Sequence, residues 1–316
     1  MANLYIFGNG FDIHHDLPTK YIEFKRFLET EYGCSELGLF LMHLPESTMD
    51  NHGGYIIEQN NKKEAAQFLY NVIQESVNDD KWTDFEESLG NIECLDLFYS
   101  DIMSTQYADD EWKDLGMKET LLLQASTDLY TNMELISKLF TEWVESIDLT
   151  DKKPDPRFVL KFNSTDIFLN FNYTTTLEDL YECKTVTHIH GKAGKDRLVI
   201  GHCTDYTTGN SDSDLFDDIR DNGLKDIHNL LKKPTKRIIR DNDSFFSSIA
   251  NVDSIIVFGW GYGKVDYDYF RKIKDMVKPT TKWILCYHRD SSSAENFKQE
   301  LNINGDVVLD ENFLGP

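Results

Sequence analysis

The residues of this chain best suited to chemistry are glycines, asparagines and histidines that directly follow its apolar segments. The first apolar run, Leu4 to Phe7, leads straight into Gly8-Asn9-Gly10. Glycine has no Cβ, so it allows positive φ angles and lets main-chain N–H groups come close to a bound phosphate. This stretch predicts a nucleotide site. The alternative is a plain tight turn, because the dinucleotide fingerprint wants a third glycine where this chain has Ile13.

Similar groups follow the later apolar segments. Asn172 carries an amide that can bond a ribose, an amide or a water, and His190 is the natural acid or base because its ordinary pKa lies near neutrality. His188 points to the opposite face of the same expected strand, so we expect it to be a buried histidine bonded to the main chain. The candidate groups are Gly8-Asn9-Gly10, Asn170-Phe171-Asn172-Tyr173-Thr174, His190-Gly191, Gly201-His202 and Gly259-Trp260-Gly261.

An acidic cluster lies in Trp82-Thr83-Asp84-Phe85-Glu86-Glu87. Asp84, Glu86 and Glu87 could bind a metal or act as acid and base. Helical geometry sends these side chains to different sides, however, and the first turn of a helix favours acidic residues in any case. We therefore expect a capping and packing role.

Alternating patterns predict the elements that position these groups. Amphipathic spacing predicts helices over residues 19–32, 61–78, 82–103, 120–147, 267–277 and 294–301. Between residues 20 and 150 there is no strand candidate. Short apolar runs predict strands at Leu4–Phe7, Thr165–Phe171, Thr185–Ile189, Leu198–Ile200, Ser254–Phe258, Lys282–Tyr287 and Val307–Leu309. Such alternation is typical of a parallel sheet covered on both faces, in which ligands bind at the carboxyl ends of the strands.

The chain divides at a proline-containing polar stretch, Thr150 to Pro156, which has the composition of a linker. We predict an α/β, Rossmann-like and mostly parallel sheet formed by residues 1–18 and 157–316, with residues 19–156 as a large all-helical insertion. Pro45 to Gly54 and the acidic segment Asp205 to Asp221 are expected to be surface loops.

Composition limits the partners. The formal charge of −23, from 55 acidic and 32 basic residues, repels nucleic acid and anionic lipid. The basic cluster between Lys225 and Arg240 lacks interleaved aromatic residues, so we expect a solvated face there. There is no apolar run of about 20 residues and no basic start of a signal peptide, which favours a cytoplasmic protein with no membrane partner. Five scattered cysteines without a CxxC pair support neither disulfides nor a zinc module, and no metal is expected.

Several motifs follow one another along the chain: Gly8-Asn9-Gly10-Phe11-Asp12, Leu17-Pro18-Thr19 with Tyr21, Trp82-Thr83-Asp84-Phe85-Glu86, Asn170-Phe171-Asn172-Tyr173-Thr174 with Leu177-Glu178, His188-Ile189-His190-Gly191, and Phe258-Gly259 with Asp266 and Tyr269-Phe270. Together they resemble the AbiH family of bacteriophage abortive infection proteins. The match runs in order over nearly the whole chain. More distantly, the Gly-x-Gly loop, the Leu-Pro, the strand-end Asn and the His-Gly are similar to SIR2-like NAD-binding enzymes.

The SIR2-like resemblance implies NAD as substrate or ligand and a SIR2-like fold. It would place the diphosphate on Gly8 and Gly10, the nicotinamide ribose near Asn172, the catalytic base at His190, and Gly259 on the adenosine side. The catalytic residues would be His190 and Asn172, and the nucleotide-binding residues Gly8, Asn9, Gly10, Phe11, Asp12, Asn170, Thr174, Gly191, Gly259 and Asp266.

The sequence departs from the SIR2-like pattern at three places. Asp12 stands where sirtuins have a small hydroxyl residue, Asp16 replaces a glycine, and Trp260-Gly261 stands where His-Ser is usual. An acid at position 12 is awkward beside a diphosphate, so it would cap the helix or bond a ribose hydroxyl. The absence of a four-cysteine zinc module argues against a protein deacetylase.

The leading hypothesis is an antiphage protein that hydrolyses NAD or a related nucleotide at the nicotinamide glycosidic bond, as an NAD⁺ glycohydrolase would. Two alternatives stay open. One is a module that senses ADP-ribose or another nucleotide without turnover, and the other is a metal-dependent nuclease that uses Asp84, Glu86 or Asp266. A phage-derived trigger and a homo-oligomer are further expected partners.

Overall fold

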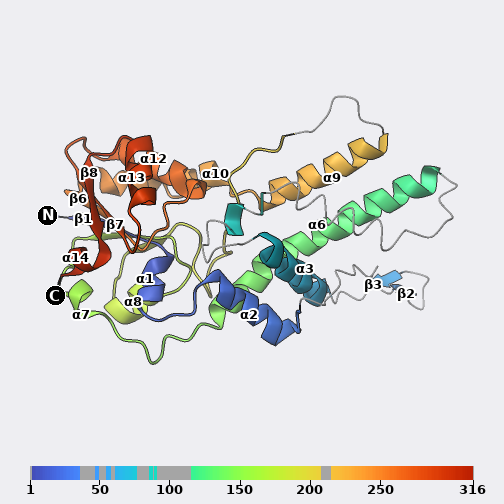
Figure 1. The fold of residues 1–316 in the computed structure, drawn as a ribbon, viewed down its shortest axis with the longest axis horizontal. Coiled ribbons are helices and arrows are strands. Elements are labelled where there is room, and N and C mark those ends of the chain that lie inside the picture. The colour runs from blue at the N-terminus through green and yellow to red at the C-terminus, as the bar shows by residue number, and fades with distance from the viewer. Residues whose placement is uncertain are drawn as a thin grey trace.

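A computed structural model of the protein describes residues 2–35, 47–49, 55–57, 61–76, 85–87, 89–90, 115–207 and 215–315. Its described part centres on a six-stranded, all-parallel sheet with the order β5-β4-β1-β6-β7-β8 (Figure 1). The strands are β1 (Asn3–Phe7), β4 (Ile167–Asn170), β5 (Val186–His188), β6 (Ser254–Phe258), β7 (Lys282–Tyr287) and β8 (Gly305–Leu309). The chain builds outward from β1 to β5 and then returns to the centre for β6, so the strand order reverses between β1 and β6. The predicted α/β, Rossmann-like sheet is confirmed.

Alternate residues of the central strand supply two hydrophobic cores. In β1, Leu4 and Ile6 point to one face of the sheet, whereas Tyr5 and Phe7 point to the other. All four are buried, which explains why the strand is an unbroken apolar run. Phe7 pairs in register with the last residues of β4 and β6, so these three strands end level with one another. The segments that follow them therefore start from one edge of the sheet.

Helices cover both faces. The core on the side of Leu4 and Ile6 includes α10 (Thr235–Asp241), α11 (Asp243–Ser248), α12 (Tyr267–Met276) and α13 (Ser292–Glu300). The core on the side of Tyr5 and Phe7 includes α1 (Asn9–His14), α7 (Pro156–Val159), α8 (Thr176–Tyr181) and α14 (Asp310–Leu314).

A separate core joins four helices beside the sheet. They are α2 (Tyr21–Tyr32), α3 (Asn61–Ser76), α6 (Leu115–Glu145) and α9 (Leu215–Leu231). α9 follows β5 in sequence, yet it packs along α6, and Figure 1 shows the pair extending together away from the sheet. The helical block thus draws on two separate segments of the chain. Across the described helices, none has the length and apolar content of a membrane span.

The helix patterns at residues 19–32, 61–78, 120–147, 267–277 and 294–301 are confirmed within a few residues, except that α6 begins five residues before its predicted start. The helix predicted at 82–103 falls largely outside the described residues. Within that range the structure describes only a helical turn at 85–87 and a turn at 89–90.

A short antiparallel hairpin corrects two expectations. β2 (Ser47–Met49) pairs with β3 (Tyr55–Ile57), so residues 20–150 are not without strands and part of the loop expected from Pro45 to Gly54 is a strand. Other residues of that loop lie outside the described ranges. Three-residue strands are too short to show an alternating pattern, and pairing between strands is invisible to local periodicity.

Leu198–Ile200 is not a strand, contrary to expectation. Val199, its middle residue, makes hydrogen bonds to a loop carbonyl and a side chain and none in a β-ladder. The N–H of Val199 donates to the His190 carbonyl at 2.8 Å, and its carbonyl accepts from the Tyr173 hydroxyl at 2.8 Å. The apolar pattern arose because this segment packs against buried side chains, which needs no sheet.

The loop predicted from Asp205 to Asp221 is wrong from residue 215 onward, because those residues belong to α9. Residues 208–214 lie outside the described ranges. Ile219, Leu224 and Ile227 pack into the helical core. The acidic residues dominate the composition, but the apolar ones recur at helical spacing and decide the structure.

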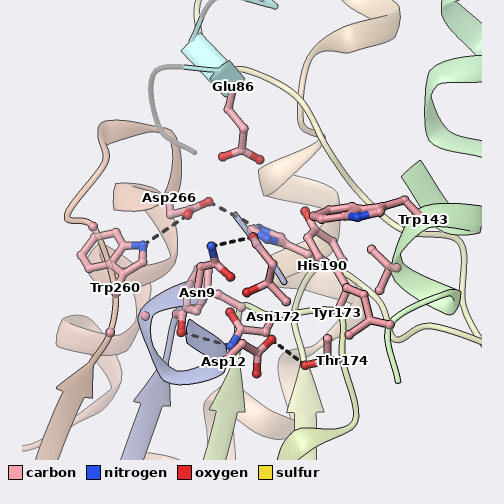
Figure 2. A pocket seen from close by; sticks show the side chains of 18 residues that line it. Asn9, Asp12, Glu86, Trp143, Asn172, Tyr173, Thr174, His190, Trp260 and Asp266 are labelled. Carbon is pink, nitrogen blue, oxygen red and sulfur yellow. Dashed lines mark hydrogen bonds and ion pairs between the residues drawn. The ribbon is translucent and has the colours of Figure 1, made fainter. Parts of the chain in front are cut away.

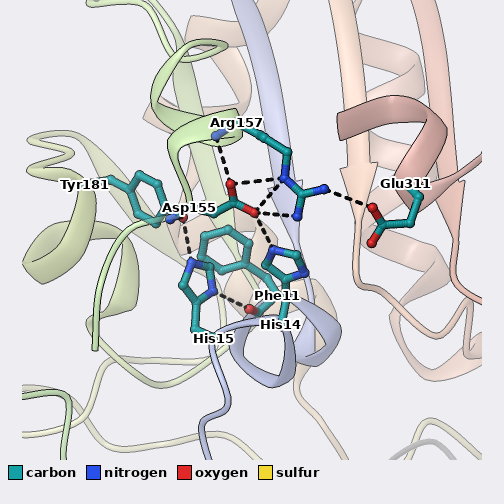
Figure 3. A network of polar contacts seen from close by, with 7 residues as sticks. All are labelled: Phe11, His14, His15, Asp155, Arg157, Tyr181 and Glu311. Atoms are coloured by element: carbon teal, nitrogen blue, oxygen red, sulfur yellow. Dashed lines mark hydrogen bonds and ion pairs between the residues drawn. The ribbon is translucent and has the colours of Figure 1, made fainter. Parts of the chain in front are cut away.

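The predicted linker, Thr150 to Pro156, is anchored at its end by a polar network (Figure 3). The Asp155 carboxylate accepts from the Arg157 N–H at 2.8 Å and thereby caps α7, and it lies 2.8 Å from His14 Nε2 in α1. Arg157 also donates to Glu311 of α14 at 2.9 Å. Hydrogen bonds from Arg157 hold the pKa of Asp155 below its ordinary value. The chain that leaves the helical block is thus bonded to α1, near the N-terminus, and to α14, near the C-terminus.

Candidate functional site

A cavity of about 240 Å³ lies where β1, β4 and β6 end, at the point where the strand order reverses. Figure 2 shows labelled side chains just beyond the strand ends, with Glu86 above them and Trp143 of α6 at the right. The sequence-predicted residues that line it are Gly8, Asn9, Gly10, Asp12, Asn172, Thr174, His190, Gly259 and Asp266. Residues far apart in the sequence therefore meet in one place.

The glycine loop is held by close backbone packing. α1 starts at Asn9, directly after Gly8, and the local sequence pattern did not predict this helix. A Cβ on Gly10 would lie 2.6 Å from the Cα of Gly259, which itself has a φ of +67°. The Gly10 N–H donates to the Gly259 carbonyl at 2.6 Å, and the Gly8 N–H to the Phe258 carbonyl at 3.1 Å. These glycines let two loops touch, and their N–H groups are occupied by protein carbonyls, so the loop shapes the cavity more than it offers a row of donors.

Asp12 is almost fully buried and is held by two hydroxyl groups. Thr174 Oγ1 donates to one carboxylate oxygen at 2.6 Å, and Thr176 Oγ1 donates to the other at 2.8 Å. Burial raises the pKa of Asp12 to about 6, although these hydrogen bonds partly oppose the shift. Asp12 thus joins α1 to the start of α8 and also faces the cavity.

Asn172 lines the cavity in a fixed orientation. Its Nδ2 donates to the Gly8 carbonyl at 3.1 Å, and its main-chain N–H donates to Oδ1 of Asn170 at 3.0 Å. Asn170 itself lies behind the cavity wall as the support for this turn. Asn9 is fixed in a similar way, because its Nδ2 donates to the Thr19 carbonyl at 2.8 Å.

His190 is buried, lines the cavity, and differs from its neighbour on the same segment. His190 Nε2 lies 3.4 Å from Asp266 Oδ1, but within the described residues it makes no hydrogen bond. Burial and the charge of Lys233 lower the pKa of His190, although Asp266 opposes this, so the ring is neutral near pH 7. His188, as expected, bonds the main chain: its Nδ1 lies 3.0 Å from the Asn172 carbonyl.

A buried ion cluster forms one end of the site. Lys233 Nζ lies 2.7 Å from Glu86 Oε1 and 3.2 Å from Asp266 Oδ1, and its side chain is wholly inaccessible to solvent. Burial alone would lower the pKa of Lys233, but the two carboxylates outweigh it and raise that pKa. Lys233 and His190 hold the pKa of Asp266 below its ordinary value despite burial. Burial raises the pKa of Glu86 to about 7, only partly offset by Lys233.

This cluster corrects two expectations. Glu86 does not cap or merely pack a helix, because its carboxylate faces the cavity and pairs with a lysine (Figure 2). Lys233 belongs to the basic stretch that was expected to be a solvated face, yet it is buried. The partners of both lie far away in sequence, so local charge patterning could not identify the pairing. In the sequence, only the acidic motif around Glu86 indicated a possible functional group in this part of the site.

Aromatic side chains wall the cavity. Trp143 comes from α6, Tyr173 and Phe171 from the turn after β4, and Trp260 from the loop after β6. Trp260 Nε1 also donates to Asp266 Oδ2 at 3.4 Å. Trp143 belongs to the apolar stripe that predicted a helix, and nothing in that pattern distinguished it from core residues. The helical block therefore contributes directly to the site.

Some predicted residues lie elsewhere. Phe11 points into the core beneath the sheet, and Gly191 packs against the Arg197 carbonyl. Gly201 and His202 do not line the cavity: His202 is fully buried beside His228, with ring centroids 4.2 Å apart.

The metal hypothesis named Asp84, Glu86 and Asp266. Asp84 lies outside the described residues, and Glu86 and Asp266 both contact the ammonium of Lys233. Among the residues with described positions, no group of three or more His, Cys, Asp or Glu is arranged to hold a metal ion.

Comparison with known proteins gives one match. A family model described as "Bacteriophage abortive infection AbiH" matches residues 4–287, which includes every residue of the cavity. No curated protein and no solved structure shows significant similarity to the chain.

Proposed function

The chain belongs to the AbiH family of bacteriophage abortive infection proteins, and within that defence role we propose that it hydrolyses NAD or a related nucleotide at the bond between nicotinamide and ribose. Loss of NAD would stop the metabolism on which an infecting phage depends.

The observation that carries this proposal is the convergence of Asn172, His190 and Asp266 on one cavity at the reversal point of a parallel sheet. Ligands of open α/β sheets bind at this point. A cavity of about 240 Å³ with aromatic walls suits a flat ring and the sugar attached to it.

His190 would act as the general base. Its neutral ring has an Nε2 without a hydrogen bond among the described residues, so this nitrogen can accept a proton from a water molecule. The water oxygen bonds to C1′ of the ribose, the bond from C1′ to the ring nitrogen breaks, and its electron pair goes to the ring, which leaves as neutral nicotinamide. The imidazolium that forms is stabilised by Asp266, 3.4 Å away.

Asn172 would position the ribose or the water, because its amide is fixed by the Gly8 carbonyl. Positive charge develops on the ribose as the glycosidic bond breaks. A buried carboxylate such as Asp266 stabilises that charge more effectively than water would. These groups supply positioning and electrostatic stabilisation, and His190 supplies the proton transfer.

The test measures NAD and nicotinamide by mass spectrometry after induction in cells, with and without phage, and in purified protein supplied with the phage trigger. We expect NAD to fall and nicotinamide to rise with wild type. His190→Ala and His190→Asn should each reduce the rate of NAD loss and nicotinamide release by at least about 10²-fold, which is typical of a lost general base. His288→Ala is the matched control, since that side chain is 76% exposed. If NAD stays intact and the His190 variants defend as well as wild type, the proposal is wrong.

A second candidate function is nucleotide sensing without turnover. It is favoured by one observation: Trp143, Val144 and Ile147 of the helical block line the same cavity, so a bound ligand would touch both parts of the protein. This function predicts ligand binding that survives His190→Ala, with no product at any stage.

A further inference from the structure

Among the residues with described positions, the ion cluster at one end of the cavity leaves a negative charge without a partner. Glu86 and Asp266 both line the cavity, and the Lys233 ammonium contacts both. One positive charge balances one carboxylate. With His190 neutral, the cluster carries a net charge of about −1 whenever both carboxylates are ionised.

A buried charge without a partner is costly, so the protein must compensate for it. A proton on Glu86 does so. Burial and the neighbouring Asp266 raise the pKa of Glu86 to about 7, even though Lys233 opposes this. A ligand with a positive charge at this end would compensate equally well and would displace that proton.

An independent observation indicates that a ligand belongs here. The Nε2 atom of His190 is buried, lies beside Asp266 on the cavity wall, and has no hydrogen-bond partner among the described residues. The rings of Trp143, Tyr173 and Trp260 surround the same space (Figure 2). Aromatic faces attract cations, and they also exclude the water that would otherwise screen the carboxylates.

We propose that this end of the cavity binds a positively charged aromatic ring and that Glu86 releases its proton when the ring binds. The inference rests on the proposed function and adds a substrate class to it: an N-substituted pyridinium, as in oxidised nicotinamide, and not the neutral reduced ring. On binding, the carboxyl proton passes to solvent and the ring takes its place as the counter-charge. No other bond changes.

Other titratable groups surround Glu86 and must be separated from it. Lys233 and Asp266 contact the cluster directly, and burial raises the pKa values of Tyr173 and Tyr269, which stay neutral near pH 7. His190 is neutral, and the Cys203 thiol has a raised pKa because of burial. Asp12 titrates at about 6 in the same cavity, so a variant of Glu86 is needed to assign any pH dependence.

The experiment compares two probes that share a ring and an amide: the cation 1-methylnicotinamide and neutral nicotinamide. Their binding to the full chain is titrated by ligand-observed NMR at pH 6 and pH 8. Since Glu86 is about 10% ionised at the lower pH and about 90% at the higher, the cation should bind about tenfold more tightly at pH 8. At pH 8 it should also bind at least about tenfold more tightly than nicotinamide, whose affinity should not change.

Glu86→Gln should remove both the preference and its pH dependence. Glu87→Gln is the matched control, because it removes the same charge from the adjacent, exposed residue and should retain both. Thermal unfolding confirms that each variant is folded. The inference is overturned if the wild type does not bind the cation, if it binds both probes equally, or if Glu86→Gln changes nothing.

The result is independent of catalysis. If the cation binds as expected but NAD is not cleaved, the proposed hydrolysis is wrong and the charge preference stands. If NAD is cleaved while both probes bind equally, the hydrolysis stands and the role of Glu86 is wrong.

Discussion

Replacing Lys233 by methionine should destabilise the protein more than any other charge change near the cavity. Methionine keeps an unbranched side chain of similar length, so the main loss is the ammonium that contacts Glu86 and Asp266 at 2.7 and 3.2 Å. Removing one partner of a buried ion pair leaves uncompensated charge and costs about 3–5 kcal/mol. Because two carboxylates are involved, we expect the upper half of that range near pH 7.

The pH dependence gives a sharper signature. In wild type the pKa of Asp266 is lowered, so its contribution to stability is present above pH ~4 and is lost as the pH falls further. Without Lys233 the carboxylates of Glu86 and Asp266 repel each other, and both pKa values should rise above those of the unfolded chain. The folded variant then binds more protons than the unfolded one. The difference between the free energies of unfolding of wild type and Lys233→Met should therefore grow from about pH 5 to about pH 8.

Urea unfolding, followed by circular dichroism at three pH values, measures these differences. Lys232→Met is the matched control, because Lys232 pairs with Asp205 at the surface and should cost less than about 1 kcal/mol. The double variant Lys233→Met with Glu86→Gln should recover part of the loss, since one negative charge is removed. Lys233 is not the counter-charge of the two carboxylates if Lys233→Met lowers the free energy of unfolding no more than Lys232→Met does, or if its loss of stability does not increase with pH.

Three further predictions follow from single residues. Gly10→Ala should cost several kcal/mol in urea unfolding, because its Cβ would meet the backbone of Gly259, whereas Gly194→Ala, with a φ of +72° and open space, should cost only about 1 kcal/mol; equal effects would contradict the close packing. Asp12→Asn should gain stability relative to wild type between pH 4 and pH 7, by on the order of 3 kcal/mol, because the raised pKa of buried Asp12 penalises its ionised form; a difference that does not change with pH would exclude this. Asp155→Asn should lower stability at pH 7 by about 1–3 kcal/mol, and this difference should start to shrink as the pH falls below about 4 and continue to shrink until the folded carboxylate is itself protonated; a difference that does not shrink in acid would show that the loss is not electrostatic.

Much of the sheet domain could be predicted from local sequence. β1, β4, β6 and β7 each have an apolar run that alternates between two cores, and this pattern is set by residues adjacent in the chain. The rule that ligands bind at the carboxyl ends of parallel strands then directed attention to Asn172 and His190, which the structure does bring together. Periodicity failed for Leu198–Ile200, where burial against loops produced the same apolar pattern without a ladder.

Local patterns missed groups from the helical block and from the segment between α9 and α10. Trp143 has the spacing of an ordinary core residue, and Lys233 sits among other lysines that are more exposed. The short helix α1 was hidden as well, because Gly8 and Gly10 disfavour a helix in isolation and are required here by the contact with Gly259. In each case the deciding partner is remote in sequence.

The sequence by itself therefore determined the parallel sheet, most of its helices and the family to which the protein belongs, because these depend on patterns of neighbouring residues. Only the tertiary structure decided that Glu86 faces the cavity and that Lys233 contacts both Glu86 and Asp266. The physical reason is that the cost of a buried charge depends on which groups surround it in space, and those groups come from segments that only folding brings together.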